Sequence, residues 1–143
     1  MNKLLPNMRW LTLPSAFAGE DWKEVSQKLD ETILNSGWDL AEESVYLLYD
    51  ADPDSVMKGE AHCKIARSVI GPKKDPGGDF DLFDWKAATV FQKPLVATTW
   101  DGIFREAMNE WKNTEKSYRV FMLCVRRRMN KGLSLETEAI FAE

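Results

Sequence analysis

The sequence predicts an α+β domain in which two strand-helix-strand-strand units form one antiparallel sheet, with both helices packed on the same face. Three patterns support this prediction. The most regular amphipathic helix follows a strand within residues 84–113, a second helical pattern occurs near the start of the chain, and short apolar runs bounded by turn residues follow each helix. Two such units can place their strands in one sheet and bury both helices against it.

The length and composition are those of one ordinary globular domain. The chain has 143 residues, 44% of them hydrophobic and 29% charged, and a formal net charge of −4. An acidic chain lacks the basic face of a nucleic-acid binder, so no direct nucleic-acid partner is expected. No apolar run reaches the roughly 20 residues of a membrane helix, and no secretory signal pattern is present, so a cytoplasmic location is expected. Cys63 and Cys124 lack metal-ligand spacing, and no metal or cofactor is expected.

The first half contains a strand, a helix and two further strands. Residues 8–13 alternate so that Met8, Trp10 and Thr12 share one face, and Pro14 is expected to end the strand. A helix is expected over residues 20–36, with Gly37 just beyond its end. Its apolar stripe consists of Trp22, Val25, Leu29 and Ile33. Strands are expected over residues 44–50 and 60–70.

The second half repeats this order after a breaker-rich stretch. Residues 71–79 are the expected linker between halves at about 1–71 and 80–143. A strand lies within residues 80–92, most clearly 86–91, and a tight connection through Lys93 and Pro94 leads into a helix over residues 94–113. The apolar stripe of this helix consists of Trp100, Ile103, Phe104, Ala107, Met108 and Trp111. Strands over residues 118–127 and 135–141 follow, joined by a turn at residues 130–132.

The order and several local motifs resemble the GyrI-like (gyrase-inhibitor-like) small-molecule-binding domains, which also form effector-binding modules of multidrug-responsive transcription regulators. The resemblance covers essentially the whole chain. Besides the element order, it rests on three passages: Ala87-Ala88-Thr89-Val90-Phe91 leading to Trp100 and Trp111, Tyr49-Asp50-Ala51-Asp52-Pro53, and Leu135-Glu136-Thr137-Glu138-Ala139-Ile140. The resemblance implies a stand-alone binding protein for a hydrophobic, aromatic small molecule, with cationic ligands included, held between the two halves.

The resemblance and the aromatic residues together define the candidate binding residues. Many drug-binding members carry a buried glutamate on the strand after the second helix, whereas residues 118–125 here contain no acid. Glu136 or Glu138 on the last strand matches a family carboxylate position and is the candidate replacement. Aromatic side chains in or beside strands complete the expected lining. The candidate ligand-binding residues are Trp10, Tyr46, Trp85, Phe91, Tyr118, Phe121, Glu136, Glu138 and Phe141.

Other functions stay open at this point. Glu136 or Glu138 with Tyr46 or Tyr118 could activate water, as in related hydrolases of strained-ring aromatic compounds. An uncovered sheet face also suits a protein partner, as in an inhibitor of gyrase-inhibitor type. His62, the only histidine, could ligate haem, as in a relative with a similar duplicated fold. No catalytic residue is assigned, and the expected function is binding.

Overall fold

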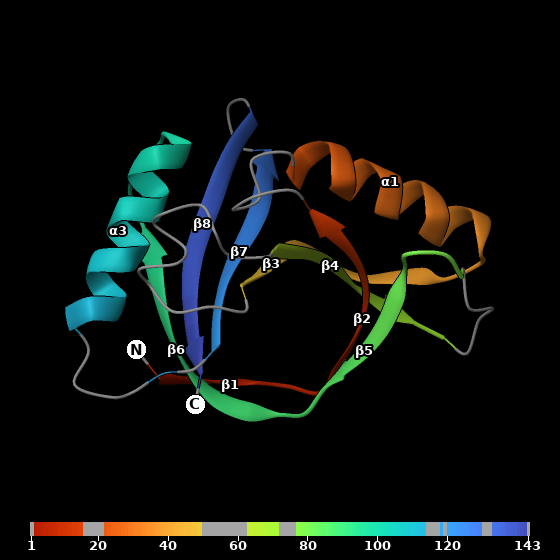
Figure 1. Ribbon diagram of the computed structural model, residues 1–143, viewed down its shortest axis with the longest axis horizontal. Coiled ribbons are helices and arrows are strands. Elements are labelled where there is room, and N and C mark those ends of the chain that lie inside the picture. The colour runs from red at the N-terminus through yellow and green to blue at the C-terminus, as the bar shows by residue number, and fades with distance from the viewer. Residues whose placement is uncertain are drawn as a thin grey trace.

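The computed structural model describes residues 2–15, 22–49, 63–71, 77–113, 118, 120–129 and 133–142. Eight strands and two helices account for most of them (Figure 1). In chain order they are β1 (Asn2–Leu5), β2 (Met8–Ser15), α1 (Trp22–Asn35), β3 (Asp39–Tyr49), β4 (Cys63–Ile70), β5 (Asp81–Trp85), β6 (Ala88–Leu95), α3 (Trp100–Asn113), β7 (Val120–Met129) and β8 (Leu133–Ala142).

All strands belong to one antiparallel sheet with the order β1-β6-β8-β7-β3-β4-β2-β5. The predicted α+β class, the single antiparallel sheet and the two packed helices are therefore confirmed. The order is symmetric about the β7–β3 pair, because β6-β8-β7 on one side corresponds to β2-β4-β3 on the other. The duplication of one unit, the boundaries of the halves and the linker at residues 71–79 stay predictions.

The sheet curls until its two ends meet (Figure 1). Leu5 of β1 pairs with Ala88 of β6, and Met8 of β2 pairs with Trp85 of β5. Both ladders share one register, because Met8 is three residues after Leu5 and its partner Trp85 is three residues before Ala88. At the corner between the ladders, the Ala87 N–H donates to Asn7 Oδ1 at 2.7 Å. Since β1 leads into β2 and β5 leads into β6, this long antiparallel pairing closes the sheet into a ring.

The closed sheet has two faces, each with its own apolar cluster. The helix face packs against α1 and α3, and it includes alternate strand residues such as Leu11, Leu47 and Ile65. Side chains on the opposite face point into the ring, and we call this the inner face. Its buried residues are Leu5, Trp10, Tyr46, Ala66, Val90, Met122, Cys124, Ile140 and Ala142, with Met8, Leu48, Trp85 and Val120 packed around them. The alternation predicted for residues 8–13 is therefore correct.

Several predicted boundaries are wrong. Residues 80–92 contain two strand segments, β5 and the start of β6, rather than one strand. Pro94 lies inside β6, opposite Glu138, and Pro14 lies inside β2, opposite Lys64. Both prolines are tolerated because the described ladders give these parts of β2 and β6 only one partner strand, so a missing N–H breaks no second ladder. Strand β1 was not predicted, since four residues with an exposed Leu4 carry little strand signal.

The helix ends follow local capping rules. Gly37, with φ 74°, follows α1 as expected, and the Trp38 N–H donates to the Ile33 carbonyl at 3.1 Å. Helix α3 starts at Trp100 rather than near residue 94, because Thr99 is its N-cap and its Oγ1 accepts the Gly102 N–H at 3.1 Å.

The segment before α3 is held by a side chain from the helix. Glu106 Oε1 accepts the Val96 and Ala97 N–H groups, each at 3.0 Å. These contacts account for the extended backbone where a helix was expected. No helix in the described ranges has the length and apolarity needed to cross a membrane.

Candidate functional site

An aromatic cluster occupies the inner face where β2, β3 and β5 lie together. Trp10 is 1% exposed, and its ring centroid lies 5.2 Å from that of Tyr46 and 5.5 Å from that of Trp85. Phe83 stacks on Trp10 at 5.8 Å. Ala66, on the strand between β2 and β3, leaves room for Trp10 and Tyr46 to meet across it. Trp10, Tyr46, Phe83 and Trp85 form what we call the inner aromatic cluster.

A polar patch adjoins this cluster on the same face. Tyr46 is opposite Cys124 on β7, and Cys124 is opposite Glu138 on β8, so the three side chains form one row across the sheet. The Tyr46 hydroxyl donates to the Glu42 carboxylate, and Arg126 Nε donates to Ser44 Oγ at 3.2 Å. We call Glu42, Ser44, Cys124, Arg126 and Glu138 the inner polar patch.

The two carboxylates act on the groups between them. Burial raises the pKa of Tyr46, and the negative charge of Glu42 and the hydrogen bond to it raise that pKa further. Burial also raises the pKa of the Cys124 thiol, with Glu138 and Glu42 adding to the effect while Ser44 and Arg126 oppose it. The thiol and the phenol are therefore neutral at physiological pH.

An irregularity in β3 presents Glu42 to Tyr46. Between Leu40 and Val45 the register of β3 against β4 shifts, because residues 41–44 include more chain than β4 can pair. Arg67 of β4 contacts two carbonyls of this bulge from the helix face. Its Nη1 donates to the Glu43 carbonyl at 2.9 Å and to the Ser44 carbonyl at 3.3 Å. Arg67 therefore supports the backbone that carries the acidic part of the inner polar patch.

A separate hollow of about 650 Å³ lies on the helix face beside α1. Its walls come from α1, β3, β4 and β7. They consist of Trp22, Lys23, Glu24, Ser26, Gln27, Asp30, Leu40, Glu43, Val45, Arg67 and Val125. Arg67 Nε lies 3.0 Å from Asp30 Oδ1, an ion pair whose N–H is not aligned as a hydrogen bond. The volume is within the range of small-molecule pockets.

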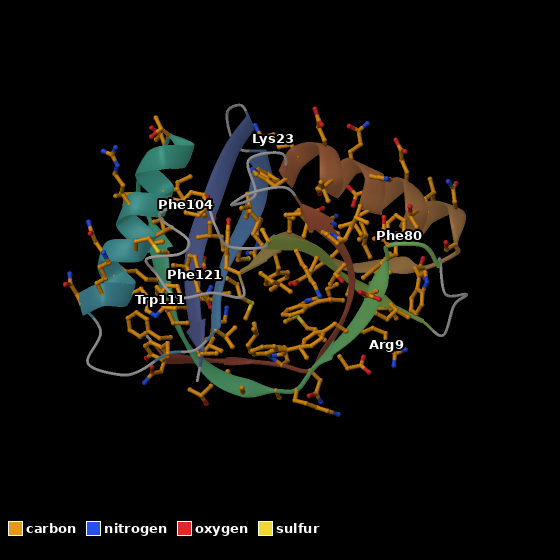
Figure 2. All side chains as sticks on the ribbon, viewed as in Figure 1. Arg9, Lys23, Phe80, Phe104, Trp111 and Phe121 are labelled. Atoms are coloured by element: carbon orange, nitrogen blue, oxygen red, sulfur yellow. The ribbon has the colours of Figure 1, made fainter. Side chains whose placement is uncertain are left out.

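The structure separates the candidate residues by face. Trp10, Tyr46 and Trp85 lie in the inner aromatic cluster. Glu138 lies on the same face, across Cys124 from Tyr46, with Glu136 further along β8. The other candidates are on the helix side. Phe91, Tyr118, Phe121 and Phe141 contact one another there, and Trp111 of α3 packs on Phe121 and Phe141. Figure 2 shows Trp111 between α3 and the sheet, close to Phe121. Ligand binding by all nine residues stays a prediction.

Sequence reasoning missed Glu42, Phe83, Arg67 and the hollow beside α1. Arg67 could have been found, because it shares a strand face with the apolar Ile65 and Val69, where an arginine needs buried partners. Glu42 could not, because its approach to Tyr46 depends on a bulge.

The remaining sites considered from sequence involve cysteine, histidine and metal. Cys63 and Cys124 are both buried, and neither is in a disulfide within the described residues. The candidate haem ligand His62 lies outside the described residues. Within the described ranges, no group of three or more His, Cys, Asp or Glu residues could hold a metal ion.

Comparison with known proteins gives structural matches only. No family model matches the sequence, and no curated protein has a matching sequence. The crystal structure of the EcmrR C-terminal domain matches 99% of this chain and 94% of its own, with a TM-score of 0.73 at 9% identity. SAV2435 bound to tetraphenylphosphonium matches 99% of this chain and 91% of its own, with a TM-score of 0.52 at 6% identity.

The chain has the GyrI-like fold. The resemblance seen in the sequence is thus confirmed at the level of fold. A hydrolase encoded by lin2189 from Listeria innocua has a TM-score of 0.58 at 10% identity, with 99% of this chain and 89% of its own covered. The chain spans 55% of EcmrR in its DNA complex, so the match there covers about half of that protein. At these identities, activity does not transfer with the GyrI-like fold.

The two buried tyrosines of this fold predict alkaline unfolding. Burial raises the pKa of both Tyr46 and Tyr49 above the ordinary value near 10, with Cys63 adding to the effect at Tyr49. Above pH 10 the unfolded chain releases these protons while the folded chain keeps them. The free energy of unfolding should then fall by about 1.4 kcal/mol per pH unit for each tyrosine. Denaturant unfolding between pH 8 and 11 measures this slope.

Variants distinguish this effect from general alkaline instability. Tyr49→Phe should remove about half of the slope above pH 10, although it also changes the baseline stability. Phenolate absorbance that titrates reversibly near pH 10 at both positions in the folded protein would show that the two hydroxyls are accessible and that the explanation is wrong.

Proposed function

We propose that this protein binds a hydrophobic, aromatic small molecule, cationic ligands included, on the inner face of the sheet. The observation that carries the proposal is the inner aromatic cluster, whose Tyr46 donates a hydrogen bond to Glu42 and lies in one cross-strand row with Cys124 and Glu138. Aromatic faces next to carboxylates attract organic cations through charge pairing and cation–π contacts. The structure of SAV2435 bound to tetraphenylphosphonium, which shares the fold, supports this class of ligand.

The inner face is favoured over the helix face for a physical reason. Phe91, Phe121 and Phe141 on the helix face already pack against one another, and Phe121 and Phe141 also pack against Trp111 of α3. A ligand bound among these aromatic residues would have to displace α3, and none of them lines the hollow beside α1. On the inner face, β5 is held by β2 alone in the described ladders, and Phe83 is 49% exposed, so the cluster can be reached from that side.

Two ions of equal size and opposite charge test the role of Glu138. Tetraphenylphosphonium should bind more tightly than tetraphenylborate, because the nearby carboxylates favour the cation. Glu138→Gln should weaken cation binding about tenfold, which is about 1.4 kcal/mol, and leave the anion unaffected or improved. Tryptophan fluorescence and calorimetry measure both affinities.

Glu136→Gln is the comparison variant, since Glu136 is the other candidate carboxylate and is exposed on the same face of β8. It should change cation affinity by less than about threefold. Equal binding of the two ions, or equal effects of the two variants, would contradict the assignment of Glu138. No binding of any aromatic probe would contradict the proposed function itself.

Hydrolysis and protein binding are the less supported alternatives. Tyr118 contacts Phe91 and Phe141 on the helix side, so it does not share a face with Glu138. Tyr46 does lie beside a glutamate, since it donates a hydrogen bond to Glu42. That pair and the match to the Listeria hydrolase are what favour hydrolysis. Binding of a protein partner stays a prediction.

A further inference from the structure

Two indole N–H groups on the inner face have no hydrogen-bond partner among the described residues. Trp10 Nε1 and Trp85 Nε1 are both buried, and no acceptor among the described residues receives either N–H. The two rings lie 5.5 Å apart, so these donors belong to one small region. A buried donor without an acceptor lowers stability, and native proteins rarely leave one unmet.

The neighbouring polar groups do not meet this need. The Tyr46 hydroxyl donates its hydrogen bond to Glu42, on the side of Tyr46 where β3 bulges. Gln92 Oε1 is an acceptor on the same face, opposite Ile140, yet it is also buried and receives no donor from the part of the chain that the structure describes. Unpaired donors and an unpaired acceptor therefore coexist on one face without reaching each other, which is the pattern of a site shaped for a polar group on a ligand.

The position of Trp85 gives the region a way in. Among the described strands β5 pairs with β2 alone, and the side chains of β5 are mostly exposed. Phe83 and Trp85 of β5 lie over Trp10, so a small displacement of β5 would open the space between the indole rings. The apolar surroundings and ring faces favour a flat aromatic molecule.

We propose that the ligand of the inner aromatic cluster is an aromatic ketone or a similar ring system with a carbonyl oxygen, and that this oxygen accepts the N–H groups of Trp10 and Trp85. This inference rests on the proposed function and specifies its ligand class. A hydrocarbon of the same shape would leave both donors unpaired and would bind less tightly.

Fluorenone and fluorene test the inference, because they share one ring skeleton and differ by the carbonyl oxygen. Fluorenone should bind about five- to tenfold more tightly than fluorene, and its addition should move two of the indole N–H signals in a nitrogen-15 NMR spectrum. Trp85→Phe should reduce the fluorenone preference toward twofold. Trp38→Phe is the matched control, since Trp38 is buried in the helix-face cluster, and it should leave the preference unchanged.

The outcomes separate the inference from the proposed function. If fluorenone and fluorene bind equally, or if only tetraphenylphosphonium binds, the inference is wrong and binding on the inner face stands. Equal binding is also the result expected if a buried water already accepts the two N–H groups. If none of the three probes binds, both fail. If Trp85→Phe does not fold, the indole signals of the unsubstituted protein still distinguish these outcomes.

Discussion

Trp111→Ala is expected to lower the free energy of unfolding by about 3–5 kcal/mol. Trp111 is buried, and its ring lies 5.1 Å from that of Phe121 and 6.0 Å from that of Phe141. Its removal leaves a cavity between α3 and two strands that cannot close, because both phenylalanines are fixed in the sheet. Figure 2 shows how directly this side chain connects the helix to the sheet. Denaturant unfolding followed by circular dichroism measures the loss.

Trp111→Phe is the control for the size of the cavity. This variant keeps an aromatic ring packed on Phe121. It should lower the free energy of unfolding by less than half of the loss expected for Trp111→Ala. A loss below about 1 kcal/mol for Trp111→Ala would mean that α3 is not held to the sheet by this stripe. In that case the aromatic residues of the helix face would again be candidates for ligand contact.

Arg67→Met should lower the free energy of unfolding by about 2–4 kcal/mol, through the bulge of β3. The arginine side chain is 8% exposed, and the substitution leaves the Glu43 and Ser44 carbonyls without their donor. The same bulge presents Glu42 to Tyr46, so aromatic cation binding should weaken as well. Denaturant unfolding and a tetraphenylphosphonium titration measure the two effects.

Asp30→Asn separates the carbonyl contacts from the ion pair. The Asp30 side chain is 45% exposed, and its ion pair with Arg67 is poorly aligned. Neutralising the Asp30 carboxylate should therefore lower the free energy of unfolding by less than about 1 kcal/mol. Equal losses for the two variants would show that the ion pair, and not the support of the bulge, accounts for the stability that Arg67 provides.

The fold was predictable where the burial of one side of a helix or strand makes apolar residues recur at regular intervals in the sequence. The stripe of α3 and the alternation of residues 8–13 identified a helix and a strand face, because each pattern reflects one buried side. The closure of the ring was not predictable. It depends on β1, which is four residues long, and on a register shared with β6 and β5 that no local pattern reveals.

The candidate site was predictable in part, because residue type and position carry different information. Being aromatic made Trp10, Tyr46 and Trp85 of the inner face candidates for ligand binding. The same criterion also included Phe121 and Phe141, which lie on the helix face. Strand alternation separates them, since Glu138 and Phe141 are three residues apart on β8 and must point to opposite sides. What alternation cannot give is the pairing of β7 with β3, which places Cys124 between Tyr46 and Glu138.

Methionine methyl groups test binding on the inner face most directly. Met8 and Met122 belong to the inner-face cluster, whereas Met108 of α3 is buried on the helix face. Carbon-13 methyl spectra recorded during titration with tetraphenylphosphonium and with fluorenone should show saturable shifts of Met8 and Met122, with Met108 unchanged. Shifts confined to Met108, or no saturable shift with either probe, would contradict ligand binding inside the ring.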